Sequence, residues 1–169
     1  FAQRRTGAVT GWFGYGLGWS KRRFDELNDG EPFAPKYDRR HDVSLVLTWR
    51  TGPWTLGLNQ IYATGQAFTP AAARYRMRDP ANPFVPPSDA VLPAPKNSAR
   101  LLPYHRMDLS VKRRINLFGL EADAYLQVFN AYNRSNDWFI QYDTENPEVD
   151  PVVATMLPMV PTLGIDYQF

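Results

Sequence analysis

Several features that would place the chain in a familiar class are absent from its 169 residues. There is no cysteine, which excludes a disulfide framework and a thiolate metal site. No run of about 18 apolar residues occurs, so the sequence offers no membrane-spanning helix. Neither sign of charge dominates, because 19 basic residues stand beside 17 acidic ones, and this balance argues against a nucleic-acid partner. With two histidines and no cysteine, we also expect no metal site and no cofactor.

The chain does contain many aromatic residues and a repeated alternation of apolar and polar side chains. In six segments this alternation lasts for roughly the 9–11 residues that a tilted, membrane-crossing strand needs. The six segments are Gly7–Ser20, His41–Trp49, Trp54–Thr64, His105–Ile115, Leu120–Asn130 and Val160–Phe169. In the second of them Val43, Leu45 and Leu47 share one face, because successive side chains of a strand point to opposite sides. We therefore predict an all-β chain in which each strand has one apolar face.

The connections between these segments alternate between short and long. Arg50–Pro53 and Asn116–Gly119 are expected to be tight turns, whereas Lys21–Arg40, Gly65–Tyr104 and Ala131–Met159 are long and polar. Eight of the 15 prolines lie between residues 66 and 103, so the second long connection is a poor candidate for regular structure. Short periplasmic turns and long extracellular loops are typical of transmembrane barrels. The pattern predicts an antiparallel, up-and-down transmembrane β-barrel segment of about six strands.

The alternation also predicts a register for the two short turns. If apolar residues share a face, Ile115 lies opposite Leu120, and opposite charges then meet on the inner face. The expected inner-face ion pairs are Arg114 with Glu121 and Lys112 with Asp123. On the other face the same register sets Leu109 beside Leu126. Across the turn Arg50–Pro53, Trp49 is expected opposite Trp54, as part of an aromatic girdle at the periplasmic interface.

Six strands are too few to close a barrel, since known single-chain bacterial barrels start at about eight. Open sheet edges do not occur in lipid. We therefore expect the sheet not to close on its own, and residues 1–169 to be the C-terminal part of a longer barrel. The last strand ends on Phe169, with Tyr167 on the same face, and this ending resembles the signal that the outer-membrane assembly machinery recognises in nascent barrels.

Four short sequence motifs, which we call phrases, resemble motifs of the TonB-dependent receptors of Gram-negative outer membranes and occur in the same order. They are Tyr37–Asp42 (YDRRHD), Ala63–Pro70 (ATGQAFTP), Pro103–Asp108 (PYHRMD) and Phe129–Asn136 (FNAYNRSN). The resemblance implies the end of a 22-stranded barrel whose N-terminal plug and TonB-contacting region are not among these residues. It further implies a place in the cell outer membrane and import of a bulky nutrient such as an iron chelate, cobalamin or an oligosaccharide. The implied partners are outer-membrane lipid, the barrel-assembly machinery, the TonB system and the nutrient itself.

Two other functions stay open from the sequence, an outer-membrane barrel enzyme such as a protease or phospholipase, and a soluble β-barrel that binds an apolar ligand. We expect no enzyme, because cationic partners would keep Glu121 and Asp123 both ionised and so unsuited to acid–base catalysis. The residues of the long loops with the side chains best suited to touch a ligand are Arg74, Tyr75, Arg76, Arg78, Trp138, Phe139 and Tyr142.

Overall fold

The computed structural model describes residues 1–82, 84, 88–143 and 150–167, and within these ranges the chain is all-β. The one helical element there is a single 3-10 turn at Asn28–Gly30. Seven strands form one antiparallel sheet: β1 (Ala2–Arg4), β2 (Val9–Leu17), β3 (His41–Thr51), β4 (Trp54–Ala63), β9 (Tyr104–Leu117), β10 (Leu120–Phe129) and β13 (Val160–Tyr167). No helix among the described residues is long and apolar enough to cross a membrane.

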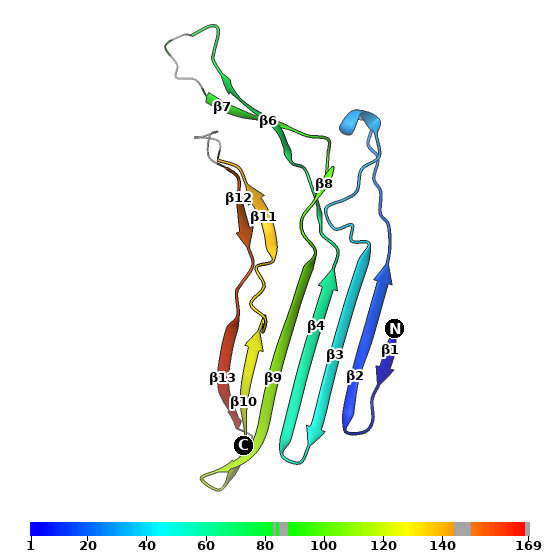
Figure 1. Cartoon of the computed structure of the whole chain (residues 1–169), viewed down its shortest axis with the longest axis vertical. Coiled ribbons are helices and arrows are strands. Elements are labelled where there is room, and N and C mark those ends of the chain that lie inside the picture. The colour runs from blue at the N-terminus through cyan, green and yellow to red at the C-terminus, as the bar shows by residue number, and fades with distance from the viewer. Residues whose placement is uncertain (83, 85–87, 144–149, 168–169) are drawn as a thin grey trace.

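The strands of the main sheet are hydrogen-bonded in sequence order, and the sheet is not closed (Figure 1). Strands β1 and β13 form its two opposite edges. The prediction of an antiparallel, up-and-down sheet that does not close on itself is therefore confirmed. The six expected strands are all present, and β1 is an additional short strand paired with β2.

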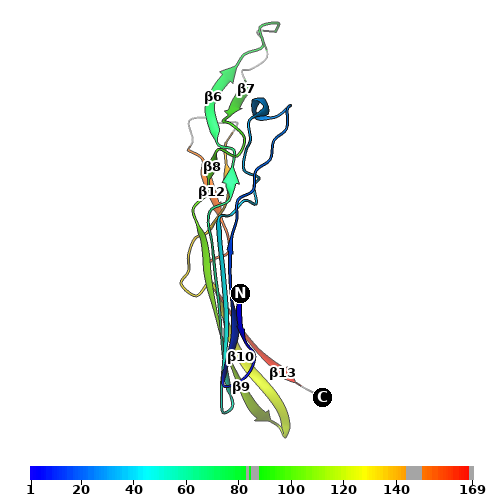
Figure 2. The same ribbon diagram turned by 90° about the vertical axis from the view of Figure 1, so that its right-hand side faces the viewer.

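All three long connections leave the same end of the sheet, which we call the loop end, and the short turns lie at the other, the turn end (Figure 1). Seen edge-on in Figure 2, the main sheet is a single layer. The surface area of the whole chain, 12200 Å², exceeds the roughly 8,500 Å² expected of a compact monomer of this mass. Both faces of the sheet are thus largely uncovered by the chain itself.

The expected register at the β9–β10 turn is wrong by two residues. Asp123 lies opposite Arg114, and Glu121 lies opposite Asn116. The turn consists of Phe118 and Gly119 alone, whose φ angles of 54° and 84° match a two-residue type I′ turn. Because a shift of two residues leaves each side chain on its predicted face, the apolar pattern does not distinguish the two registers. On the apolar face, Leu126 lies opposite Val111 and Leu109 opposite Val128.

The β3–β4 turn requires the same correction. Trp49 lies opposite Leu56, and Trp54 opposite Thr51, rather than opposite each other. The turn is again two residues long, with Gly52 at a φ of 55°, as a type II′ hairpin turn requires at its first central position.

The long connections contain more regular structure than expected. Between β4 and β9, β5 (Ala67–Phe68) pairs with β8 (Ala99–Arg100), and β6 (Ala71–Met77) pairs with β7 (Ser88–Pro93). Between β10 and β13, β11 (Asp137–Gln141) pairs with β12 (Val152–Thr155). The expectation that proline would prevent structure in Gly65–Tyr104 is wrong, because Pro70 precedes β6 and Pro93 ends β7 opposite Ala71, so neither interrupts the ladder.

Candidate functional site

The main sheet has one continuous apolar face that runs across its strands. Register places these side chains on it: Phe13 and Tyr15 of β2, Val43, Leu45, Leu47 and Trp49 of β3, Trp54, Leu56, Leu58 and Tyr62 of β4, Met107, Leu109 and Val111 of β9, Ala124, Leu126 and Val128 of β10, and Leu163, Ile165 and Tyr167 of β13. Many of them are exposed, such as Leu163 at 79% and Ile165 at 51%. An apolar surface of this extent marks contact with lipid or with another protein.

Aromatic side chains line this face near both of its ends. Near the loop end, an upper aromatic row consists of Tyr15, His41, Tyr62, His105 and Tyr132. Ring contacts join Tyr15 to His41, and join His105 to both Tyr62 and Tyr132, at centroid distances of 5.4–6.5 Å. Both histidines form a hydrogen bond between Nδ1 and a tyrosine hydroxyl, at 2.9 Å for His41 with Tyr15 and 2.8 Å for His105 with Tyr132.

Near the turn end, a lower aromatic row consists of Trp49, Trp54 and Tyr167. The guanidinium of Arg113 lies 4.9 Å from the ring centroid of Trp54. Tyr62 follows Trp54 by eight positions on β4, which corresponds to about 26 Å along the strand. Because strands of transmembrane barrels tilt by about 35–45°, this separation spans roughly 19–22 Å of the membrane normal, somewhat less than the apolar band of about 25 Å that such barrels present to lipid.

The opposite face of the sheet is polar. A cross-strand row of Thr48, Gly57, Ser110, Gln127 and Thr162 runs over its middle and lines an open hollow of about 380 Å³. Towards the turn end, Lys112 Nζ lies 2.8 Å from Asp123 Oδ2, which confirms one expected ion pair, although the two residues are diagonal neighbours. The other pair is corrected, since Arg114 lies opposite Asp123 and not Glu121.

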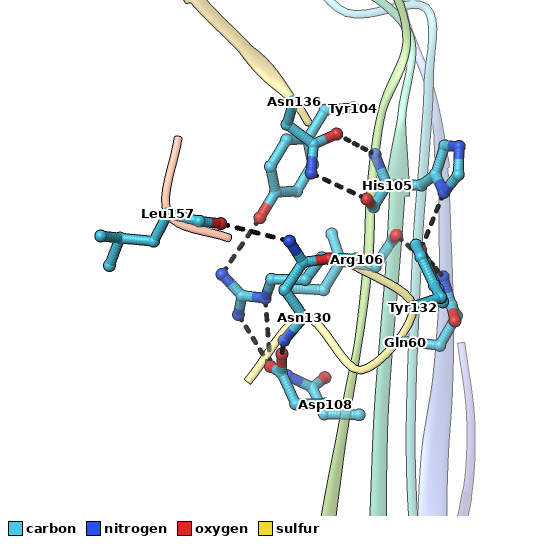
Figure 3. A network of polar contacts seen from close by, with 11 residues as sticks. Gln60, Tyr104, His105, Arg106, Asp108, Asn130, Tyr132, Asn136 and Leu157 are labelled. Carbon is cyan, nitrogen blue, oxygen red and sulfur yellow. Dashed lines mark hydrogen bonds and ion pairs between the residues drawn. The ribbon is translucent and has the colours of Figure 1, made fainter. Parts of the chain in front are cut away.

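The two C-terminal phrases that resemble the receptor family meet at the loop end of β9 and β10 (Figure 3). Asn130 is fully buried there, and its side chain donates to the backbone carbonyls of Arg134 (2.9 Å) and Leu157 (3.2 Å). It also accepts a hydrogen bond from the backbone N–H of Arg134 at 3.1 Å. Asn136 is buried as well and exchanges two hydrogen bonds with the backbone of His105. We call this set of contacts the Asn130 junction.

A charged group completes the Asn130 junction. Asp108 accepts from the backbone N–H of Asn130 at 3.0 Å and from the Arg106 guanidinium at 2.9 Å. The same guanidinium lies 4.1 Å from the ring centroid of Phe129. Each polar group in this set has a partner, so the junction fastens the β10–β13 connection to the top of β9 instead of leaving reactive groups free.

The two N-terminal phrases take part in a second cluster, which we call the Asp38 junction. Buried Asp38 forms an ion pair with Arg100 of β8 and accepts from the backbone N–H of Ser20 at 2.7 Å. Arg100 also donates to the backbone carbonyls of Asp38 and Gly65. Burial opposes ionisation, but the hydrogen bonds and positive charges around it hold the pKa of Asp38 below its usual value. This junction ties the β2–β3 connection to both ends of the β4–β9 connection.

The seven expected ligand contacts lie on or just after β6 and β11, beyond these junctions. The structure brings Arg74 and Tyr142 together, with the guanidinium 5.3 Å from the ring centroid. The Tyr142 hydroxyl accepts from the backbone N–H of Ala71, which joins the two hairpins. The rings of Trp138 and Phe139 are 5.2 Å apart. Several of the seven are exposed to solvent: Tyr75, Arg76, Arg78, Trp138 and Phe139.

The remaining site expectations concern the C-terminal assembly signal and metal binding. Tyr167 ends β13 opposite Ala122, at the turn end of the sheet. Phe169, expected to belong with it to an assembly signal, lies outside the described residues. Sequence reasoning missed Asp38, Arg100 and Asn130 as organising residues, although two of them lie within the phrases that carry the family resemblance. Among the described residues, no group of three or more His, Asp and Glu is placed to hold a metal ion.

Comparisons of the chain with known protein families, curated proteins and solved structures found no match in any of the three. The account of its function therefore rests on the sequence and on the geometry described above.

Proposed function

We propose that the chain forms part of the wall of a barrel in the outer membrane of a Gram-negative bacterium, within a TonB-dependent receptor that imports a scarce, bulky nutrient. The observation that carries the proposal is the apolar face bounded by two aromatic rows. It has the composition of a surface in contact with lipid, while the opposite face suits a water-filled interior.

Because the long connections lie at one end of the sheet and the short turns at the other, the two ends can be assigned to the two sides of the membrane. The three long connections share one end, where the Asp38 junction joins the first to the second and the Ala71–Tyr142 hydrogen bond joins the second to the third, so they form a braced structure above the sheet. In this proposal that structure faces the medium and contributes to nutrient capture. The turn end faces the periplasm, where energy from the inner membrane reaches such receptors through TonB.

The resemblance of the four phrases supports the receptor class in particular. In the structure they do not lie scattered over the surface but take part in the Asp38 junction and in the Asn130 junction, the second of which Figure 3 shows. The residues of these phrases fix the long loops on the barrel wall, which receptors with large external loops require.

Uptake measurements test the transport proposal. Cells that express the full-length protein should accumulate one of the nutrient classes, with iron chelates, cobalamin and oligosaccharides tested in turn. Accumulation should stop when a protonophore collapses the inner-membrane proton gradient, while binding to the cell surface persists. Uptake that continues without the gradient, or hydrolysis of lipid or peptide by the purified protein, would contradict the proposal.

A second test removes the outer part of the β4–β9 connection and leaves the two junctions intact. Excision of residues 72–92 takes away most of β6 and β7 but keeps Arg100, and the hydrogen bond from Ala94 N–H to the Pro70 carbonyl still closes the base. Nutrient binding should then weaken by about tenfold or more with the barrel still folded, since no bond of the main sheet is touched. A matched Arg100→Ala variant should instead lower the yield of folded barrel.

A further inference from the structure

The connection between β2 and β3 sorts its charges by position. Six cations lie in the two segments nearest the sheet: Lys21, Arg22, Arg23, Lys36, Arg39 and Arg40. Four carboxylates lie at the tip: Asp25, Glu26, Asp29 and Glu31. A pair of backbone hydrogen bonds between Arg22 and Phe33, both 2.9 Å, holds the two segments together as a stem. The carboxylate of the stem, Asp38, is buried in its ion pair with Arg100, and Arg40 of the stem also acts on its charge.

Four of these cations are available to a partner outside the chain, and we call Lys21, Arg22, Lys36 and Arg40 the basic stem. Each is exposed, and none forms an ion pair with another described residue. Arg22 is steadied by Tyr37, whose hydroxyl accepts from the guanidinium at 2.9 Å and whose ring lies 5.3 Å below it. The remaining two are directed elsewhere, because Arg39 lies over the ring of Tyr104 and Arg23 points towards Gly30 at the tip.

The basic stem lies directly beyond the upper aromatic row. Arg40 precedes His41 of that row, and its carbonyl accepts from the backbone N–H of Gly18 at 3.1 Å. Leu17 and Trp19, exposed at 51% and 64%, extend the apolar surface of β2 up to Lys21. Figure 1 shows the connection rising from the loop ends of β2 and β3. The order along the molecule is therefore apolar face, aromatic row, cations and then carboxylates.

A lipid leaflet presents matching chemistry in the same order. Hydrocarbon gives way to an interface that favours aromatic rings, and the phosphate groups of anionic headgroups lie just outside it. Cations gain free energy at that level, and carboxylates would lose it, so their placement at the tip removes them from the phosphates. Arg22 offers a planar guanidinium for two phosphate oxygens, and the two lysines act as point charges.

We propose that the basic stem binds the phosphate groups of an anionic lipid headgroup in the leaflet at the loop end of the sheet. This inference rests on the proposed placement of the sheet in a membrane. It adds a specific lipid site on the outer surface of the wall, separate from the hairpins offered as nutrient contacts.

The test uses the full-length protein reconstituted into two kinds of vesicle, phosphatidylcholine alone and phosphatidylcholine containing diphosphorylated lipid A. The number of lipid A molecules retained per protein after gel filtration in detergent is measured by native mass spectrometry. A Lys21→Ser, Lys36→Ser, Arg40→Ser variant should bind lipid A on the order of 100-fold more weakly, from the usual gain per cation at an anionic surface. The control variant Arg4→Ser, Arg5→Ser, Arg50→Ser removes the same charge at the turn end and should bind like the wild type.

The outcomes separate the two proposals. If the wild type inserts into both vesicles and the two triple variants retain lipid A equally, the basic stem is not a lipid site, although the wall proposal stands. If inorganic phosphate or pyrophosphate displaces lipid A at millimolar concentration, the stem is a site for soluble phosphate, and the lipid assignment is wrong. If the wild type stays monodisperse in buffer without detergent and inserts into neither vesicle, the membrane placement itself fails.

Discussion

At the scale of single residues, the chain depends on a few buried polar groups at the loop end. Asn130 and Asp38 are 0% and 4% exposed, in a chain whose sheet faces are mostly uncovered. Each holds together segments far apart in sequence, since Asp38 and Arg100 are separated by 62 positions. No local sequence pattern predicts such a pair, because hydrophobic periodicity does not indicate which polar groups meet across loops. The sequence therefore pointed to the phrases but not to the contacts within them.

Replacement of Asn130 tests the Asn130 junction. Asn130→Ala leaves two backbone carbonyls and one N–H without partners, so we expect the free energy of unfolding to fall by about 1–3 kcal/mol. Asn133→Ala is a matched control, because both residues have a left-handed backbone, with φ of 52° and 53°, but exposed Asn133 accepts a single bond from Met159. Urea titration followed by tryptophan fluorescence measures both. Equal losses in the two variants would show that backbone strain, not the junction, sets the cost.

The Asp38 junction should respond to acid. Because the pKa of Asp38 is lowered in the folded protein, its ion pair contributes fully to stability above the usual value of 3.8. As pH falls below 3.8, the unfolded chain takes up the proton first, and the contribution is lost as pH passes through the lowered folded pKa. The difference in unfolding free energy between wild type and Asp38→Asn should thus be constant above pH 5 and shrink below about pH 3.8.

The control for the acid response is Asp25→Asn at the exposed tip of the same connection. It should change the unfolding free energy little at neutral pH, because exposed carboxylates contribute little to stability. A difference for Asp38→Asn that grows as pH falls would contradict the account of its ion pair.

At the scale of elements, the strands and their faces could be predicted, but their register could not. The alternation in Leu120–Phe129 assigns each side chain to a face, and the structure keeps those assignments. Register depends on the turn, where Phe118 adopts a φ of 54° that is rare for a large side chain, so a two-residue turn there could not be predicted from residue type. The β6–β7 and β11–β12 hairpins were missed because their proline-rich flanks conceal short ladders without internal proline.

Gly65 tests how tightly the β4–β9 connection packs against the end of β4. A methyl group added there would overlap the backbone carbonyl of Leu101, whose N–H donates to the Gln66 carbonyl at 2.9 Å and so holds the segment in place. Gly65→Ala should therefore cost about 1–3 kcal/mol and expose the connection to protease. Gly18→Ala is the matched control, because nothing lies within 4 Å of its added methyl group, and it should change stability by less than about 0.5 kcal/mol. If both variants resist protease like the wild type, the close approach at Gly65 has no structural importance.

At the scale of the whole molecule, the sheet leaves two unlike faces uncovered. Among the described residues, the apolar side chains that are buried are only Phe33, Pro35, Ala63, Ala67 and Ala122. A chain that buries so little of its own apolar surface needs another medium to cover it, and the two aromatic rows support the proposal that this medium is lipid. This conclusion could be drawn in outline from the sequence, since it depends on period and not on register. The position of the ligand-binding residues could not, because it depends on how the hairpins cross above the sheet.

The most direct test of the central claim is the accessibility of alternate residues of β9 and β10 in a bilayer. Since this chain has no cysteine, Leu109→Cys, Ser110→Cys, Leu126→Cys and Gln127→Cys each introduce one nitroxide label into it. In vesicles, oxygen dissolved in the lipid should accelerate the spin relaxation of labels at 109 and 126 the most. A water-soluble nickel chelate should accelerate the spin relaxation of labels at 110 and 127 the most. Equal access of the nickel chelate to all four positions would contradict the account, because the apolar face would then lie in water.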